Sequence, residues 1–179
     1  RYLFIVGMPR CGSTLLESIL SLNPEVKDLG EVYFLEESLQ RTDDLLEVKN
    51  LYDEKVNLIN SEKKIFTDKN LFNFLYCPVI YNLFPNARII HCIRNPLDNI
   101  LSIYRTNFLN QSFSSSLNDI SDLYLYHQKL MKEYKSKFGS IIYSYDHEKV
   151  VRNPKETIQD LINWLDWEWN EKYLSPVSY

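Results

Sequence analysis

The 179-residue sequence has few cysteines and no excess of basic charge. Cys11, Cys77 and Cys92 are too few and too irregularly spaced for a disulfide framework or a zinc site, so we expect a reducing, cytoplasmic location. The formal net charge of -4 argues against a general nucleic-acid binder, because such proteins neutralise phosphates with many lysines and arginines. Any anion must therefore be bound locally.

Long apolar runs are also missing from the sequence. No stretch has the length of a membrane span, and none has the pattern of a signal peptide. With 45% hydrophobic residues, we expect one soluble domain over residues 1–179 with a buried core. The first apolar run starts at residue 2 with no turn before it, and the chain stops without a capped element. We therefore expect the sequence to be a fragment of a longer protein.

Short β-branched and aromatic runs alternate with helical patterns along the chain. This order predicts an α/β fold, a P-loop-containing three-layer sandwich in which helices cover both faces of a central parallel sheet. The predicted strands are 2–6, 64–67, 88–93 and 140–145.

The helices are predicted from capping residues and apolar spacing. The charged segment 42–60 is interpreted as a solvated outer helix with no assigned function. The other predicted helices are 71–84 with Asn70 as its cap and Pro78 as a kink, a helix opened by Asn95 and Pro96, one that begins at Asp119 or Ser121 and runs through Tyr134, and 153–167.

The stretch FIVGMPRCGSTLLESIL, residues 4–20, is almost a nucleotide-binding P-loop. Gly7 and Gly12 have the spacing of G-x-x-x-x-G-K-[ST], but Ser13 stands in place of the lysine. A strand that turns through glycine into a helix directs backbone N–H groups at one point, and this geometry binds phosphate or sulfate. Arg10 adds a forked donor. The alternative is an ordinary turn, but two of only four glycines lie here, which favours an anion loop.

A magnesium nucleotide would also need an acidic residue at the end of a neighbouring strand, and we find none. The strand 88–93 is followed instead by Arg94. Ser102 lies about two turns into the next helix, so the two residues can bind a further phosphate. Taken alone, they are more typical of a capping arginine and a solvated serine. Two separated anion sites together favour a nucleotide that is phosphorylated at two places.

These motifs resemble the sulfotransferase family that uses 3′-phosphoadenosine 5′-phosphosulfate (PAPS). They are most similar to its tyrosylprotein-sulfotransferase-like branch and to bacterial sulfotransferase domains that follow tetratricopeptide repeats. The segments that carry the resemblance cover nearly the whole chain, namely FIVGMPRCGSTLLESILSLNPEV, LGEVYFL, FTDKN, LFPNARIIHCIRNPLDNILSIY and IIYSYDHEKVVRNPKETIQDLINWLDWEW. The family usually continues into a basic, glycine-containing segment that closes over PAPS, and this sequence ends at Tyr179 without it.

The resemblance implies metal-free, in-line transfer of a sulfuryl group from PAPS to a hydroxyl of a tyrosine, a sugar or a small alcohol, which leaves adenosine 3′,5′-bisphosphate (PAP). It implies that Lys69 and Arg10 contact the transferring group and that Glu31, or a neighbouring residue, is the base. The implied catalytic residues are Glu31, Lys69 and Arg10. The implied donor-binding residues are Arg10, Cys11, Gly12, Ser13 and Thr14 for the 5′-phosphosulfate, Arg94 and Ser102 for the 3′-phosphate, and Tyr145 near the adenine or its phosphate.

Other functions stay open at this point. One is an atypical P-loop kinase that uses ATP or GTP, and another is a non-catalytic binding module on the same fold. His91 is interpreted as a core residue and as a reserve candidate for the base, whereas His127 and His147 have no assigned partner. The loop 110–119 and the region 32–60 are expected to select the acceptor. We expect neither a nucleic-acid partner nor a membrane span, and a homodimer stays open.

Overall fold

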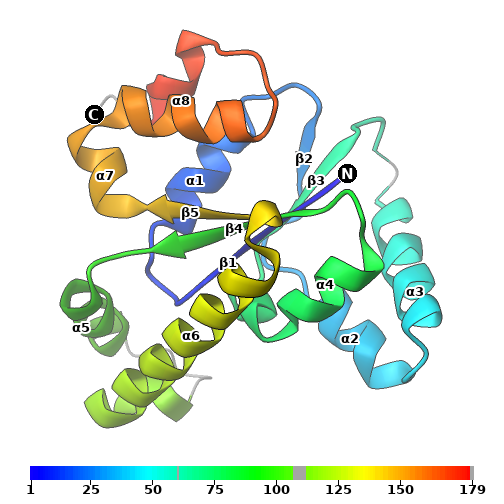
Figure 1. The fold of residues 1–179 in the computed structure, drawn as a ribbon, viewed down its shortest axis with the longest axis horizontal. Coiled ribbons are helices and arrows are strands. Elements are labelled where there is room, and N and C mark those ends of the chain that lie inside the picture. Colours follow the sequence, from blue (N-terminus) through cyan, green and yellow to red (C-terminus); the bar gives the residue numbers. More distant parts are fainter. Residues whose placement is uncertain (60, 107–111, 178–179) are drawn as a thin grey trace.

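A computed structural model describes residues 1–59, 61–106 and 112–177. Within these ranges the sheet has five strands in the order β2-β3-β1-β4-β5, and every neighbouring pair is parallel. The predicted three-layer α/β sandwich with a central parallel sheet is therefore confirmed (Figure 1). The strands are β1 (Tyr2–Gly7), β2 (Val26–Asp28), β3 (Ile65–Asp68), β4 (Arg88–Ile93) and β5 (Ile142–Asp146).

Strand β1 explains why helices cover both faces of the sheet. Its successive side chains point to opposite faces, so Leu3 and Ile5 pack against α1 and α8, whereas Phe4 and Val6 pack against α3, α4 and α6. Figure 1 shows α1 and α8 on one face of the sheet and α6, α4, α2 and α3 on the other. The helices are α1 (Ser13–Leu20), α2 (Phe34–Arg41), α3 (Leu45–Asn57), α4 (Cys77–Leu83), α5 (Pro96–Thr106), α6 (Leu117–Phe138), α7 (His147–Arg152) and α8 (Pro154–Trp164).

Several predicted elements need correction. Strand β2 was not predicted, because three residues are too short to show an alternating pattern. The predicted kinked helix 71–84 is a 3-10 helix, Leu71–Tyr76, followed by α4, and Pro78 lies in the first turn of α4, where its missing N–H costs nothing. Helix α6 begins earlier than predicted, because Ser116 caps it.

The charged segment 42–60 contains α3, which is not only a solvated helix. Val48, Tyr52 and Val56 are buried against the sheet, so only the opposite face of the helix is exposed. Of the predicted loop 110–119, residues 110 and 111 lie outside the described residues, and 112–115 form a 3-10 turn. In the part of the chain that the structure describes, none of the helices is long and apolar enough to cross a membrane.

Two predicted helix caps are confirmed and place the following helices at the sheet edge. The Asn70 side chain accepts a hydrogen bond from the N–H of Phe72, and the Asn95 side chain accepts from the N–H groups of Leu97 and Asp98. Because the strands are parallel, the residues that follow β1, β3, β4 and β5 meet at one edge of the sheet.

Candidate functional site

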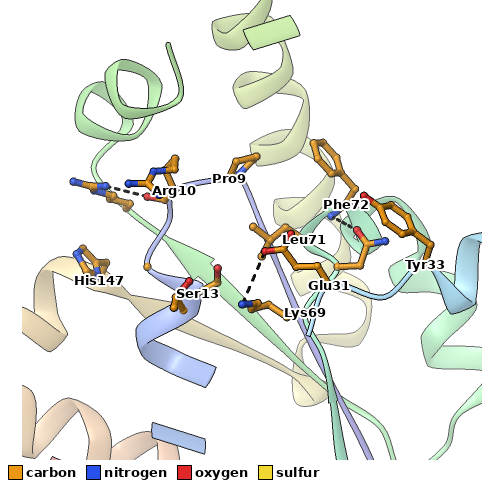
Figure 2. A pocket seen from close by; sticks show the side chains of 13 residues that line it. Pro9, Arg10, Ser13, Glu31, Tyr33, Lys69, Leu71, Phe72 and His147 are labelled. Atoms are coloured by element: carbon orange, nitrogen blue, oxygen red, sulfur yellow. Dashed lines mark hydrogen bonds and ion pairs between the residues drawn. The ribbon is translucent and has the colours of Figure 1, made fainter. Parts of the chain in front are cut away.

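A pocket of about 310 Å³ lies at this edge of the sheet (Figure 2). Its walls come from the segments after β1, β3, β4 and β5, together with the segment that leads into α2. The structure thus brings to one cavity most of the site residues predicted from sequence, namely Arg10, Gly12, Ser13, Thr14, Glu31, Lys69 and Arg94.

The turn from β1 to α1 has an unusual backbone at two positions. Gly12, which precedes the first turn of α1, has φ 91°, and Arg10 has φ 66°, both in the left-handed region. Two hydrogen bonds hold the turn: Arg94 Nη1, just after β4, donates to the Arg10 carbonyl at 3.0 Å, and the buried Asn99 amide of α5 donates to the Pro9 carbonyl at 2.7 Å. Within the described residues no side chain caps α1, so its first N–H groups are available to an anion.

A second hollow of about 350 Å³ adjoins the pocket, between the turn and α5. Arg10 and Arg94 line both cavities, and Arg10 Nε donates to Ser102 Oγ at 3.3 Å. Arg94 Nε is buried and has no hydrogen-bond partner among the described residues. Arg105 also lines this hollow and was not predicted from sequence. The predicted Arg94 and Ser102 therefore lie on one cavity, next to the turn between β1 and α1.

Lys69 follows β3 and lies on the other side of the pocket. Its Nζ is 2.8 Å from Glu17 Oε2 and 3.9 Å from Glu31 Oε1, and Figure 2 marks the second contact with a dashed line. The Lys69 N–H donates to the Gly30 carbonyl at 2.9 Å, which joins the end of β3 to the segment that carries Glu31. The structure thus brings Lys69 and Glu31 together, and adds Glu17, which sequence reasoning missed.

The expectation that no acidic residue ends a neighbouring strand is wrong. Asp68 ends β3, the strand beside β1. It is fully buried, accepts hydrogen bonds from the Tyr52 hydroxyl, the Asn70 N–H and the Asn73 amide at 3.0–3.1 Å, and lines neither cavity. Burial raises the pKa of Asp68 to about 7. The bonds from Asn70 and Asn73 to this carboxyl group therefore fix the turn that contains Lys69.

Two predicted donor-binding residues are buried and line neither cavity. Tyr145 lies in the core between the sheet and α1, and burial raises the pKa of its hydroxyl. Cys11 lies beside Cys92, where a hydrogen bond between the thiols lowers the pKa of Cys11, while burial raises that of Cys92. The roles that the resemblance implies for Tyr145 and Cys11 stay predictions, since neither side chain reaches the pocket wall.

His147, to which no partner was assigned, is part of the pocket. It is the first residue of α7, and a Cβ atom added to Gly12 would lie 2.4 Å from its Nδ1. That Nδ1 is buried and has no partner within the described ranges. Burial lowers the pKa of His147, and the nearby Arg94 lowers it further. The signal in the sequence was its position two residues after the predicted strand 140–145, at the edge where ligands bind.

The other two histidines form a buried pair. The Nε2 atoms of His91 and His127 are 2.9 Å apart, and neither residue lines the pocket. His91 is thus a core residue, as first interpreted, and not a group that can reach an acceptor.

Because His91 and His127 are buried together, we expect the folded protein to lose stability in mild acid. Burial lowers the pKa of His127 to about 4 and that of His91 well below its usual value, and Lys135 lowers both further. An unfolded histidine has a pKa of about 6.5, so the unfolded state gains protons first as the pH falls from about 6.5 toward 4. At pH 5 we expect His127 alone to cost about 2 kcal/mol of folding free energy relative to pH 7.

Urea unfolding at pH 7 and pH 5 measures this loss. The His127→Gln variant should lose about 2 kcal/mol less than the wild-type chain between the two pH values. An equal loss in both proteins would show that the pair is not the acid-sensitive group.

Comparison with known proteins finds a matching family model and two relatives. A model described as "Sulfotransferase family" matches residues 3–62 and 42–171. A putative protein-tyrosine sulfotransferase of Caenorhabditis briggsae is 26% identical over 191 residues, which cover 96% of this chain and 68% of that protein. An uncharacterized protein of Aquifex aeolicus is 29% identical over 201 residues, which cover 97% of this chain and 26% of that protein. The chain thus spans about a quarter of the Aquifex protein.

Solved structures share the fold at low sequence identity. The sulfotransferase domain from the Synechococcus PCC 7002 olefin synthase has a TM-score of 0.75 and 19% identity, covering all of this chain and 78% of that one. The sulfotransferase domain from the curacin biosynthetic pathway has a TM-score of 0.72 and 16% identity, and the match covers 99% of this chain and 77% of that domain. Mouse sulfotransferase SULT7A1, complexed with PAP, has a TM-score of 0.66 and 13% identity, and the match covers 99% of this chain and 63% of the mouse chain.

Proposed function

Since this chain belongs to the sulfotransferase family, we propose that it transfers a sulfuryl group from PAPS to a hydroxyl acceptor and leaves PAP. The observation that carries the proposal is the pair of adjoining anion sites, one at the start of α1 beside Lys69 and the other between Arg94, Ser102 and Arg105. A nucleotide with phosphates at its 5′ and 3′ positions has one group for each site. The uncapped first turn of α1 and the unpartnered Arg94 Nε are donors that such groups would satisfy.

The residues of the pocket supply the parts that this reaction needs. The N–H groups of the turn, with the Ser13 and Thr14 hydroxyls, hold the 5′-phosphate. The acceptor oxygen forms a bond to sulfur as the bond from sulfur to the phosphate oxygen breaks. The Lys69 ammonium stabilises the negative charge on the sulfuryl oxygens and on the leaving phosphate. Glu31, whose side chain is 73% exposed, takes the proton of the acceptor hydroxyl on the open side of the pocket.

The residues that line the pocket indicate the chemical class of the acceptor. Tyr33 and Phe72 line the same pocket as Glu31, and Tyr33 is 55% exposed. Flat aromatic side chains suit an aromatic ring, so a phenol such as a tyrosine side chain fits this lining better than a small alcohol. The name of the Caenorhabditis relative agrees with this choice.

The kinase alternative has less support. Ser13 replaces the lysine that contacts the β- and γ-phosphates, and the strand-end Asp68 is buried among hydrogen-bond donors and lines neither cavity.

The remaining alternative is a binding module on the same fold that catalyses no reaction. Transfer of labelled sulfate from PAPS to a phenol by the wild-type protein, and its loss in Glu31→Ala, would show an enzyme; absence of transfer would favour the binding module.

Isothermal titration tests the two-site proposal. We expect PAP to bind about 100-fold more tightly than AMP, because only PAP has a phosphate for the hollow lined by Arg94. Arg94→Ala should remove most of this difference; because Arg94 also donates to the Arg10 carbonyl of the turn, AMP affinity should fall too, but by a much smaller factor than PAP affinity. Arg88→Ala is the matched control, because Arg88 begins β4 at the opposite edge of the sheet. Equal affinities for PAP and AMP, or tighter binding of ATP that requires Mg²⁺, would overturn the proposal.

A further inference from the structure

Glu17 is not among the predicted catalytic and donor-binding residues, yet its carboxylate makes the shortest polar contact of the Lys69 side chain. We propose that Glu17 is a positioning residue, which holds the Lys69 ammonium at the pocket wall in the orientation that transfer requires. The inference rests on the proposed function, because it assigns Glu17 to the same reaction through Lys69. Glu17 does not line the pocket, so it acts on the ligand only through the lysine.

The helix that begins at the anion loop carries this carboxylate. Glu17 lies four residues after Ser13, on the same face of α1, one turn deeper along the helix. Lys69 reaches this face from the end of β3, which is hydrogen-bonded to β1. The helix that binds the anion therefore also fixes where the neighbouring cation lies.

The Glu17–Lys69 pair differs from an ordinary surface ion pair. Its two side chains are only 10% and 13% exposed, and Nζ and Oε2 are 2.8 Å apart. Glu17 Oε1 is buried without a hydrogen-bond partner among residues 1–59, 61–106 and 112–177. Lys69 is therefore the partner that compensates this carboxylate, and a buried charge that loses its partner is costly.

Glu31 cannot hold the lysine in the same way. Its oxygen is 3.9 Å from Nζ, and its side chain is 73% exposed, so the attraction is weakened by water. A lysine side chain without a close partner samples many rotamers. Contact with Glu17 restricts them and leaves the other ammonium protons free to face the pocket, which Lys69 lines.

A double-mutant cycle on kcat tests this role. Glu17→Gln should lower kcat for transfer from PAPS to a phenol at least tenfold, with KM for PAPS changed less than threefold. In a Lys69→Met background the same change should have no further effect on kcat, because the group that Glu17 positions is gone. Glu171→Gln, which breaks the ion pair with Lys155 of α8, is the matched control and should keep wild-type kcat, because neither residue lines the pocket or the adjoining hollow.

The outcomes separate the two proposals. Wild-type protein that transfers no sulfate would count against the proposed function, whereas an active wild type with a fully active Glu17→Gln variant would overturn the positioning role alone. Loss of kcat by the same factor with and without Lys69 would also overturn it, because that result indicates a structural effect.

A second measurement needs no turnover. Reductive methylation followed by peptide mass spectrometry gives the labelling rate of each lysine. Lys69 should react much more slowly than Lys64, whose side chain is 80% exposed, and Glu17→Gln should speed the labelling of Lys69 at least threefold without changing that of Lys64. An unchanged rate at Lys69 would show that Glu17 does not hold the ammonium in solution.

Discussion

Lys69→Met is expected to lower kcat for sulfuryl transfer by about 10²–10³-fold, the usual effect of removing one donor that stabilises charge in a transition state. Lys69 is the cation that lines the pocket on the side of Glu31, while Arg10 donates to Ser102 on the side of α5. The two cations that sequence reasoning placed together thus lie on different walls. PAP lacks the sulfuryl group, so its affinity should fall less than tenfold.

This variant also leaves Glu17 buried without a partner, and we expect its Tm to fall. The Glu17→Gln/Lys69→Met double variant should recover Tm but not kcat. Lys155→Met is the matched control, because Lys155 pairs with Glu171 and lines neither cavity. If Lys69→Met keeps more than a tenth of wild-type kcat at a temperature where it is folded, the catalytic role of Lys69 is wrong.

The parts of the site that the sequence could predict are those coded by short local patterns. The glycine spacing around Arg10, and the arginine after the strand 88–93 with a serine eight positions later, can be read from single segments. In a parallel sheet the ends of the strands meet at one edge, so correct strands were enough to bring Arg94 and Lys69 to one cavity.

The parts that were missed depend on packing between distant segments. Glu17 looks like any polar residue on an amphipathic helix, and only its 2.8 Å contact with a residue after β3 gives it a role. Tyr145 and His147 are two residues apart, and a motif cannot say which of them lies within the strand and which lies after it. The structure shows that the residue within β5 is buried and that the residue after it reaches the pocket.

Three of the four glycines form a matched series that tests the proposed anion loop. Gly12→Ala should lower PAP affinity at least 30-fold, because an alanine at φ 91° is strained and its Cβ would lie 2.4 Å from the His147 ring. Gly30 has φ 69° with no atom within 4 Å of an added Cβ, so Gly30→Ala carries the backbone strain without the clash. Gly139→Ala carries neither and should behave as the wild type.

Stability and affinity should respond differently across this series. Both Gly12→Ala and Gly30→Ala should lose about 1–2 kcal/mol of folding free energy from the left-handed backbone, but only Gly12→Ala should lose PAP affinity. Adding His147→Ala to Gly12→Ala removes the clash and should restore at least part of the affinity. If PAP affinity fell equally in the Gly12 and Gly30 variants, backbone strain alone would explain the loss, and close packing of α7 on the loop would have no part in anion binding.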